Sequence, residues 1–81
     1  MDQRFAMLCE LLGENVRLLR KNMGISQEEL AFMAELDRTY ISQIERGISN
    51  PSLFVLLKIA SVLNLQIADL FEGATIKKHK K

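Results

Sequence analysis

The segment Arg38–Arg46 carries the side chains of this sequence that are best suited to recognise another molecule. If it is helical, with about 100° between successive residues, its polar side chains share one side and Ile41 and Ile44 share the other. The polar side carries Arg38, Thr39, Ser42, Gln43 and Arg46. A guanidinium group can bond guanine at two points, and a carboxamide can bond adenine in the same way. The pattern therefore predicts a short helix that can read base edges.

The alternative interpretation is a solvated amphipathic helix whose polar residues serve only solubility. Two features favour recognition. The segment follows another predicted helix at turn spacing, and its polar side lacks Glu and Lys, the usual residues of a solvent-exposed helix face.

The elements just before this segment must hold it in place. Residues 26–29 (Ser-Gln-Glu-Glu) match a capping box, which predicts a helix that begins after Ser26. We expect this helix to bury Leu30, Ala31 and either Met33 or Ala34. A turn over residues 35–37 follows, in which Leu36 enters the core and Asp37 is the N-cap of the next helix. That helix is expected to run to about Arg46 and to stop at Gly47.

Three further helices are expected around this pair. Residues 3–22 contain an apolar stripe, made of Phe5, Leu8, Leu12, Val16 and Leu19. Gly13 interrupts it, so the helix either runs through Gly13 or restarts at Glu14; we favour a continuous or slightly kinked helix. Ser52 is expected to cap a fourth helix over residues 53–63, and a short fifth helix covers about residues 67–71. No strand pattern is present, so the fold class is all-α, a compact five-helix bundle.

Bulk composition fits one small globular domain. The 81 residues are 48% hydrophobic and 26% charged. No apolar run approaches 18 residues and the N-terminus has no cleavage-site pattern, so we expect no membrane contact and a cytoplasmic protein. Cys9 and His79 are single residues of their kind, and no paired carboxylates or phosphate loop stand out. We therefore expect no enzyme, no metal site and no cofactor.

The net charge of +1 gives little support to nucleic-acid binding. Lys77, Lys78, Lys80 and Lys81 supply four of the eleven positive charges, which leaves seven against ten negative charges in residues 1–76. Long-range attraction to DNA is then weak, and binding would depend on a few well-placed cations and helix N-termini.

Beyond these patterns, the chain resembles a known family. The pieces SQEELA, LDRTYISQIERG, NPSL and LKIA resemble the helix-turn-helix domain of phage repressor and Cro proteins, over about residues 12–71. Within that family they are most similar to the controller proteins of restriction–modification systems. The resemblance implies a bundle of the repressor type whose third helix enters the major groove of double-stranded DNA.

The resemblance also implies roles for individual residues. Base-contacting positions of the family correspond to Arg38, Thr39 and Gln43. Positions that contact the DNA backbone or flanking bases correspond to Gln27, Tyr40, Ser42 and Arg46, and more weakly to Arg17, Asn50 and Ser52. Gln27 is the phosphate-binding position at the start of the second helix.

Three other positions bear on the structure of the domain. Arg20 and Glu45 match a pair that forms a buried ion pair in related repressors, and Glu45 also lies beside the apolar side of its own helix. Glu35 departs from the family, because Gly is common there at a backbone position with positive φ. A Glu at such a position costs on the order of 1 kcal/mol.

The resemblance predicts a homodimeric, sequence-specific regulator on an inverted-repeat operator, controlling a restriction–modification operon and contacting RNA polymerase if it activates. An exposed apolar patch is the expected dimer interface, made of Phe54, Leu65, Ile67 and Phe71. Residues 1–73 form the DNA-binding and dimerisation domain, and residues 74–81 a flexible basic tail. The alternative function is an antitoxin-type protein-interaction module with secondary DNA binding.

Overall fold

The computed structural model describes residues 2–73, and the predicted basic tail over residues 74–81 lies outside them. The described part consists of α1 (Gln3–Asn22), α2 (Gln27–Ala34), α3 (Arg38–Glu45), α4 (Leu53–Val62) and the short 3-10 helix η1 (Ile67–Phe71). No strand occurs among these residues, so the all-α prediction is confirmed for residues 2–73. None of the helices in this part of the chain is both long and apolar enough to cross a membrane.

The fifth element of the predicted bundle is present over the expected residues, but it is a 3-10 helix and not an α-helix. In η1 the backbone N–H of Asp69 bonds to the carbonyl of Gln66, three residues earlier, at 2.9 Å. The Asp69 carboxylate in turn accepts from the Gln66 N–H at 2.9 Å. A segment of five residues is too short to propagate the four-residue spacing of an α-helix, so it closes as a 3-10 turn.

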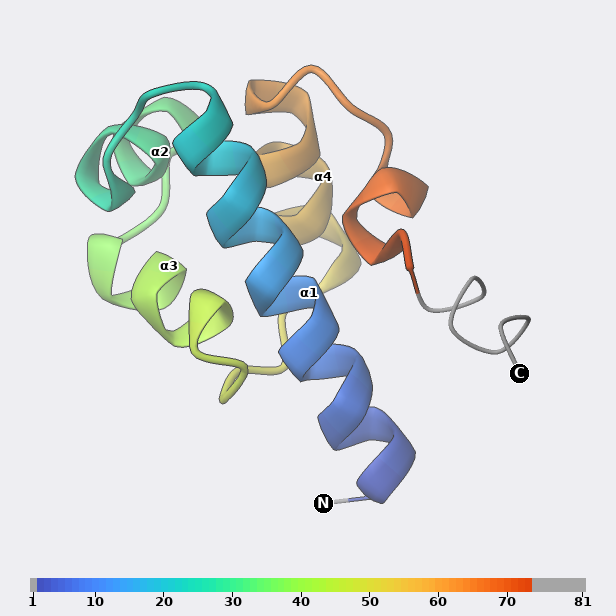
Figure 1. The fold of residues 1–81 in the computed structure, drawn as a ribbon. Helices are drawn as coiled ribbons and strands as arrows, with labels where there is room; N and C mark the ends of the chain where they lie inside the picture. Colours follow the sequence, from blue (N-terminus) through green and yellow to red (C-terminus); the bar gives the residue numbers. More distant parts are fainter. Residues whose placement is uncertain (1, 74–81) are drawn as a thin grey trace.

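The helix α1 runs along the length of the molecule and organises the other elements. Figure 1 shows α2 and α3 to one side of α1, and α4 and η1 to the other. The helix α3 packs on both α1 and α2, α2 also packs on α4, and η1 packs on α1 and α4. Every element contributes to one apolar core, which contains Leu12, Val16, Leu30, Ala31, Ile41, Ile44, Leu56, Ile59, Ala60, Leu63 and Leu70. The helix α3 is thus held between α1 and α2.

Gly13 lies inside α1, and the continuous helix that we favoured is confirmed. It is buried against the C-terminal end of α3, where an added Cβ would lie 2.7 Å from the Glu45 carbonyl oxygen. Close contact with the Ile44 carbonyl would also result. The missing side chain therefore allows two helix backbones to approach, which offsets the poor helix propensity of glycine.

The helix ends follow the sequence signals with one exception. Ser26 and Glu29 form the expected capping box, with bonds of 3.0 and 2.8 Å between each side chain and the other residue's N–H. Ser52 Oγ accepts from the N–H of Val55 at 3.1 Å. Asp37 is the N-cap of α3, but its side chain makes no capping bond. Asp37 therefore occupies the predicted N-cap position but does not make the predicted hydrogen bond to the helix backbone.

Burial distinguishes several alternatives left by the sequence. Ala34 is buried and Met33 is half exposed, so Ala34 is the core residue of that pair. Leu8, which we placed on the apolar stripe of α1, is exposed, whereas Cys9 is buried. Glu35 has φ of 59°, so the expected strained turn is present.

Candidate DNA interface

The outward side of α3 is the principal candidate surface. Ile41 and Ile44 are buried, and they attach the helix to the core. Arg38, Thr39 and Gln43 are exposed on the other side, and so is Arg46 just after the helix. The two sides inferred from the sequence therefore exist in the folded chain, and the exposed one presents guanidinium, hydroxyl and carboxamide groups to an incoming partner.

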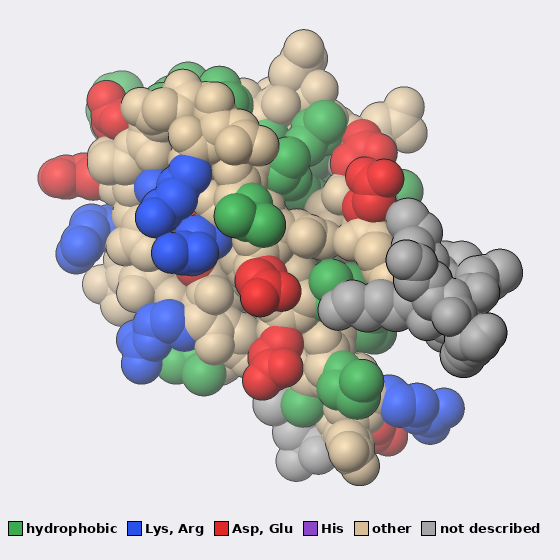
Figure 2. Space-filling view, viewed as in Figure 1, with side chains coloured by type: hydrophobic (Ala, Val, Ile, Leu, Met, Phe, Trp, Pro, Cys, Tyr) green, Lys and Arg blue, Asp and Glu red, His purple; other side chains and the backbone are tan. Residues whose placement is uncertain are grey.

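Positive charge accompanies this surface. Figure 2 shows most of the visible Lys and Arg side chains on the side of the molecule where α3 lies, over α3 and the adjoining part of α1. Arg17 is exposed on α1. A local gathering of cations can bind phosphates although the net charge of the chain is only +1.

The flanking residues differ in what they leave available. Tyr40 is half-buried and packs against the core, so only part of its ring remains accessible. Ser42 is also half-buried. Asn50 and Ser52 are exposed before α4, but the Ser52 hydroxyl already accepts a helix-capping bond. Among these residues, Asn50 is the most accessible to a phosphate.

Gln27 does not project freely from the start of α2, as the phosphate role suggested. It is half-buried, and its Nε2 atom donates to Glu45 Oε1 at 2.9 Å. Nothing in the sequence pointed to this bond, which joins the first residue of α2 to the last residue of α3.

The side chains of Arg20 and Glu45 meet beneath this surface. Arg20 Nε donates to Glu45 Oε2 at 2.6 Å, and Nη2 donates to Oε1 at 3.1 Å. The side chains are only 9% and 2% exposed. The bond to Glu45 raises the pKa of Arg20 above its usual value, although burial alone would lower it. Nη1 of Arg20 also donates to the Ile25 carbonyl at 2.9 Å, so both buried ions are well satisfied.

The predicted dimer patch is only partly exposed. Phe54 is 65% exposed, but Leu65, Ile67 and Phe71 are partly buried and pack against the core. They are partly buried because η1 folds back onto α1 and α4. The predicted patch did not include the exposed neighbours of Phe54 on α4, namely Leu53 at 74% and Leu57 at 50%. The sequence feature that indicates these exposed residues is the apolar character of α4 on more than one face.

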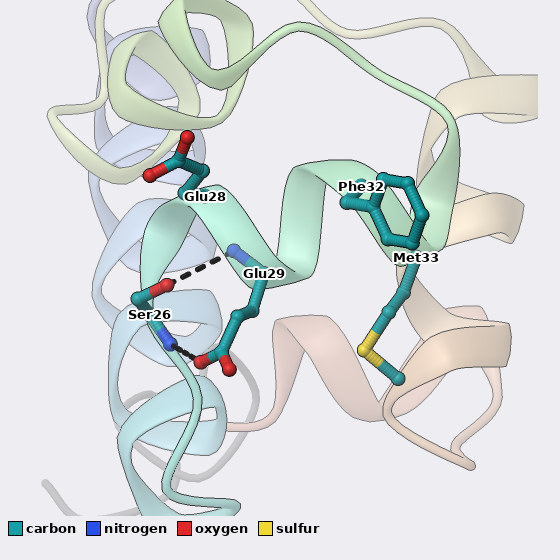
Figure 3. A pocket seen from close by; sticks show the side chains of 5 residues that line it. All are labelled: Ser26, Glu28, Glu29, Phe32 and Met33. Atoms are coloured by element: carbon teal, nitrogen blue, oxygen red, sulfur yellow. Dashed lines mark hydrogen bonds between the residues drawn. The ribbon is translucent and has the colours of Figure 1, made fainter.

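One pocket among the described residues has a lining of mixed polar and apolar side chains. Figure 3 shows a shallow surface pocket on α2, lined by Ser26, Glu28, Glu29, Phe32 and Met33. Glu29 is bonded to Ser26 within the capping box, and Phe32 and Met33 are apolar. Within residues 2–73 no group of three or more His, Cys, Asp or Glu side chains could hold a metal ion.

Comparison with known proteins gives a consistent result. A family model described as helix-turn-helix matches residues 16–70. The control protein C.BamHI of Bacillus amyloliquefaciens is 48% identical over 67 residues, which cover 82% of this chain and 83% of that protein. The control protein C.SmaI of Serratia marcescens is 38% identical over 76 residues, covering 94% and 90%.

Solved structures agree with the sequence relatives. The restriction–modification controller protein C.AhdI from Aeromonas hydrophila superposes with a TM-score of 0.76 and 43% identity, over 78% of this chain and 96% of that one. The N-terminal DNA-binding domain of SinR from Bacillus subtilis superposes with a TM-score of 0.75 and 33% identity, over 80% of this chain and 96% of that one.

Proposed function

The chain belongs to the helix-turn-helix family of DNA-binding transcriptional regulators, and we propose that it controls a restriction–modification operon as a homodimer on an inverted-repeat operator. The similarity to controller proteins over most of both chains supports the regulated system. The observation that carries DNA reading is the exposed side of α3, because its groups match base edges in the major groove and no described contact occupies them.

Within this proposal, α3 lies in the major groove. Arg38, Thr39 and Gln43 contact bases, and Ser42, Tyr40 and Arg46 contact the backbone or neighbouring bases. The remaining phosphate contacts are Gln27 at the start of α2, Arg17 on α1, and Asn50 and Ser52 before α4. Phosphate contacts set the register of the domain on the duplex, whereas base contacts give the sequence preference.

The dimer interface in this proposal is centred on α4. Phe54, Leu53 and Leu57 are large apolar side chains left open on one helix, which in a small protein favours a partner surface. Leu65, Ile67 and Phe71 pack partly against the core, so they offer less surface to a partner than Phe54 does. A two-fold axis through this interface requires two half-sites about one helical turn of DNA apart.

The test compares two variants on cognate and random duplexes. Arg38→Ala should weaken binding to the cognate site by about 1–3 kcal/mol and relax the preference at one base position. Gln27→Ala should lower the affinity for the cognate and the random duplex by the same factor, since a phosphate contact carries no sequence information. Equal losses on the two duplexes for Arg38→Ala would refute base reading by Arg38.

A further inference from the structure

One carboxylate links the buried ion pair to the proposed DNA surface. Glu45 accepts three hydrogen bonds, from Nε and Nη2 of Arg20 and from Nε2 of Gln27. The first two come from α1, and the third comes from the opening residue of α2. The third bond satisfies a further lone pair of the carboxylate, and it also ties the start of α2 to the end of α3.

We propose that Glu45 is a positioning residue for DNA binding: it holds the Gln27 carboxamide so that the second N–H of the amide faces the phosphate backbone. The inference rests on the proposed phosphate contact of Gln27. It assigns to Glu45 a part in binding beyond its pairing with Arg20.

The chemistry of the bond fixes the orientation of the amide. A carboxylate only accepts hydrogen bonds, so the nitrogen of Gln27, and not its oxygen, must face Glu45. The nitrogen carries two hydrogens, and one of them is used at 2.9 Å from Glu45 Oε1. Among the described residues, the bond to Glu45 is the one that Gln27 Nε2 makes, so the other hydrogen can donate to an external oxygen. A flexible glutamine would lose rotamer freedom on binding; a bonded one has lost most of it already.

The carboxylate itself is held firmly. Its side chain is 2% exposed, and Arg20 grips both oxygens. Arg20 also bonds the carbonyl of Ile25, directly before the cap of α2. The network therefore fixes the first turn of α2 relative to the end of α3, and with it the distance between the Gln27 amide and the base-reading side chains.

The charge of Glu45 provides a discriminating test. Removal of a negative charge from a DNA-binding surface should by electrostatics alone keep or raise the affinity for DNA. The positioning role predicts the opposite for Glu45→Gln, because a neutral amide can also donate and no longer dictates which way Gln27 lies. Glu28→Gln is the matched control, since it removes the same charge from an exposed residue of α2.

The experiment measures the affinity of the full chain for its selected operator and for a random duplex. We expect Gln27→Ala and Glu45→Gln each to lower the affinity for both duplexes by roughly tenfold, which is about the effect of one hydrogen bond to a charged group. The double variant should lose no more affinity than either single variant. Glu28→Gln should bind at least as tightly as the original chain. Losses that multiply to about a hundredfold in the double variant, or an unchanged affinity of Glu45→Gln, would overturn the inference.

A second measurement needs no substitution at Glu45 and avoids the instability that an unpaired Arg20 could cause. In the NMR spectrum of the original chain, the Gln27 side-chain amide proton that donates to Glu45 should lie downfield of its usual position, because a hydrogen bond to a carboxylate deshields it. Addition of operator DNA should move the other proton and leave the bonded one in place. If operator binds and neither Gln27 proton moves, or the bonded one is released, the inference fails while DNA binding stands. If no duplex is bound selectively, the proposed function fails first.

Discussion

Substitution of Gly13 by alanine tests how closely α1 and α3 approach. In an exposed helix this change stabilises by about 1 kcal/mol, because alanine has the better helix propensity. Here the new Cβ would lie 2.7 Å from the carbonyl oxygen of Glu45 and 2.9 Å from its carbonyl carbon. These are backbone atoms at the end of α3, which Ile44 and the Arg20–Glu45 pair hold in place, so no flexible side chain can give way.

The magnitude follows from two opposing effects. Overpacking costs about 1–3 kcal/mol, and contact with fixed backbone atoms places this site in the upper part of that range, at about 2–3 kcal/mol. The propensity gain offsets about 1 kcal/mol of it. We expect a net loss of about 1–2 kcal/mol, which for a domain of this size lowers the Tm by about 4–16 °C. Thermal and urea unfolding followed by circular dichroism measure it. Glu14→Ala, at the next and exposed residue, should change stability by less than about 0.5 kcal/mol. An unchanged or raised Tm for Gly13→Ala would refute the close approach of the two helices.

Two further predictions concern the turn and the dimer. Glu35→Gly should stabilise the domain by about 1 kcal/mol, because Glu35 has φ of 59°, which glycine adopts without strain. Glu35→Ala keeps the Cβ and should give no gain in stability. Equal Tm values for the two variants would contradict relief of backbone strain as the cause. Phe54→Asp should give a folded monomer in sedimentation, whereas a dimer that persists would place the interface elsewhere. Phe71→Asp is a poorer probe, since Phe71 packs against the core and the change would also destabilise the fold.

Features set by near neighbours in the chain were predictable from the sequence. The capping box at Ser26 depends on two residues three positions apart, and the two sides of α3 depend on helical spacing alone. Each is satisfied within a turn or two of helix, so sequence spacing describes it directly. DNA as the partner, and the major groove as the expected place of α3, came from the family resemblance and not from residue spacing.

Features set by tertiary packing were not predictable in the same way. Leu65, Ile67 and Phe71 looked available for a partner, but the return of η1 onto α1 and α4 packs them against the core. Gly13 interrupted an apolar stripe, and only the position of α3 shows why glycine is there. The bond between Gln27 and Glu45 spans 18 residues and depends on the angle between two helices.

We propose that one face of α3 reads a symmetric DNA site. Selection of bound duplexes from a random pool by the full chain tests it most directly, since it returns the half-site, the symmetry and the spacing together. We expect an inverted repeat with half-sites about one helical turn apart, and loss of preference at one position in each half-site for Arg38→Ala. Recovery of unrelated sequences with no shared half-site, or of a site that Arg38→Ala selects unchanged, would contradict it.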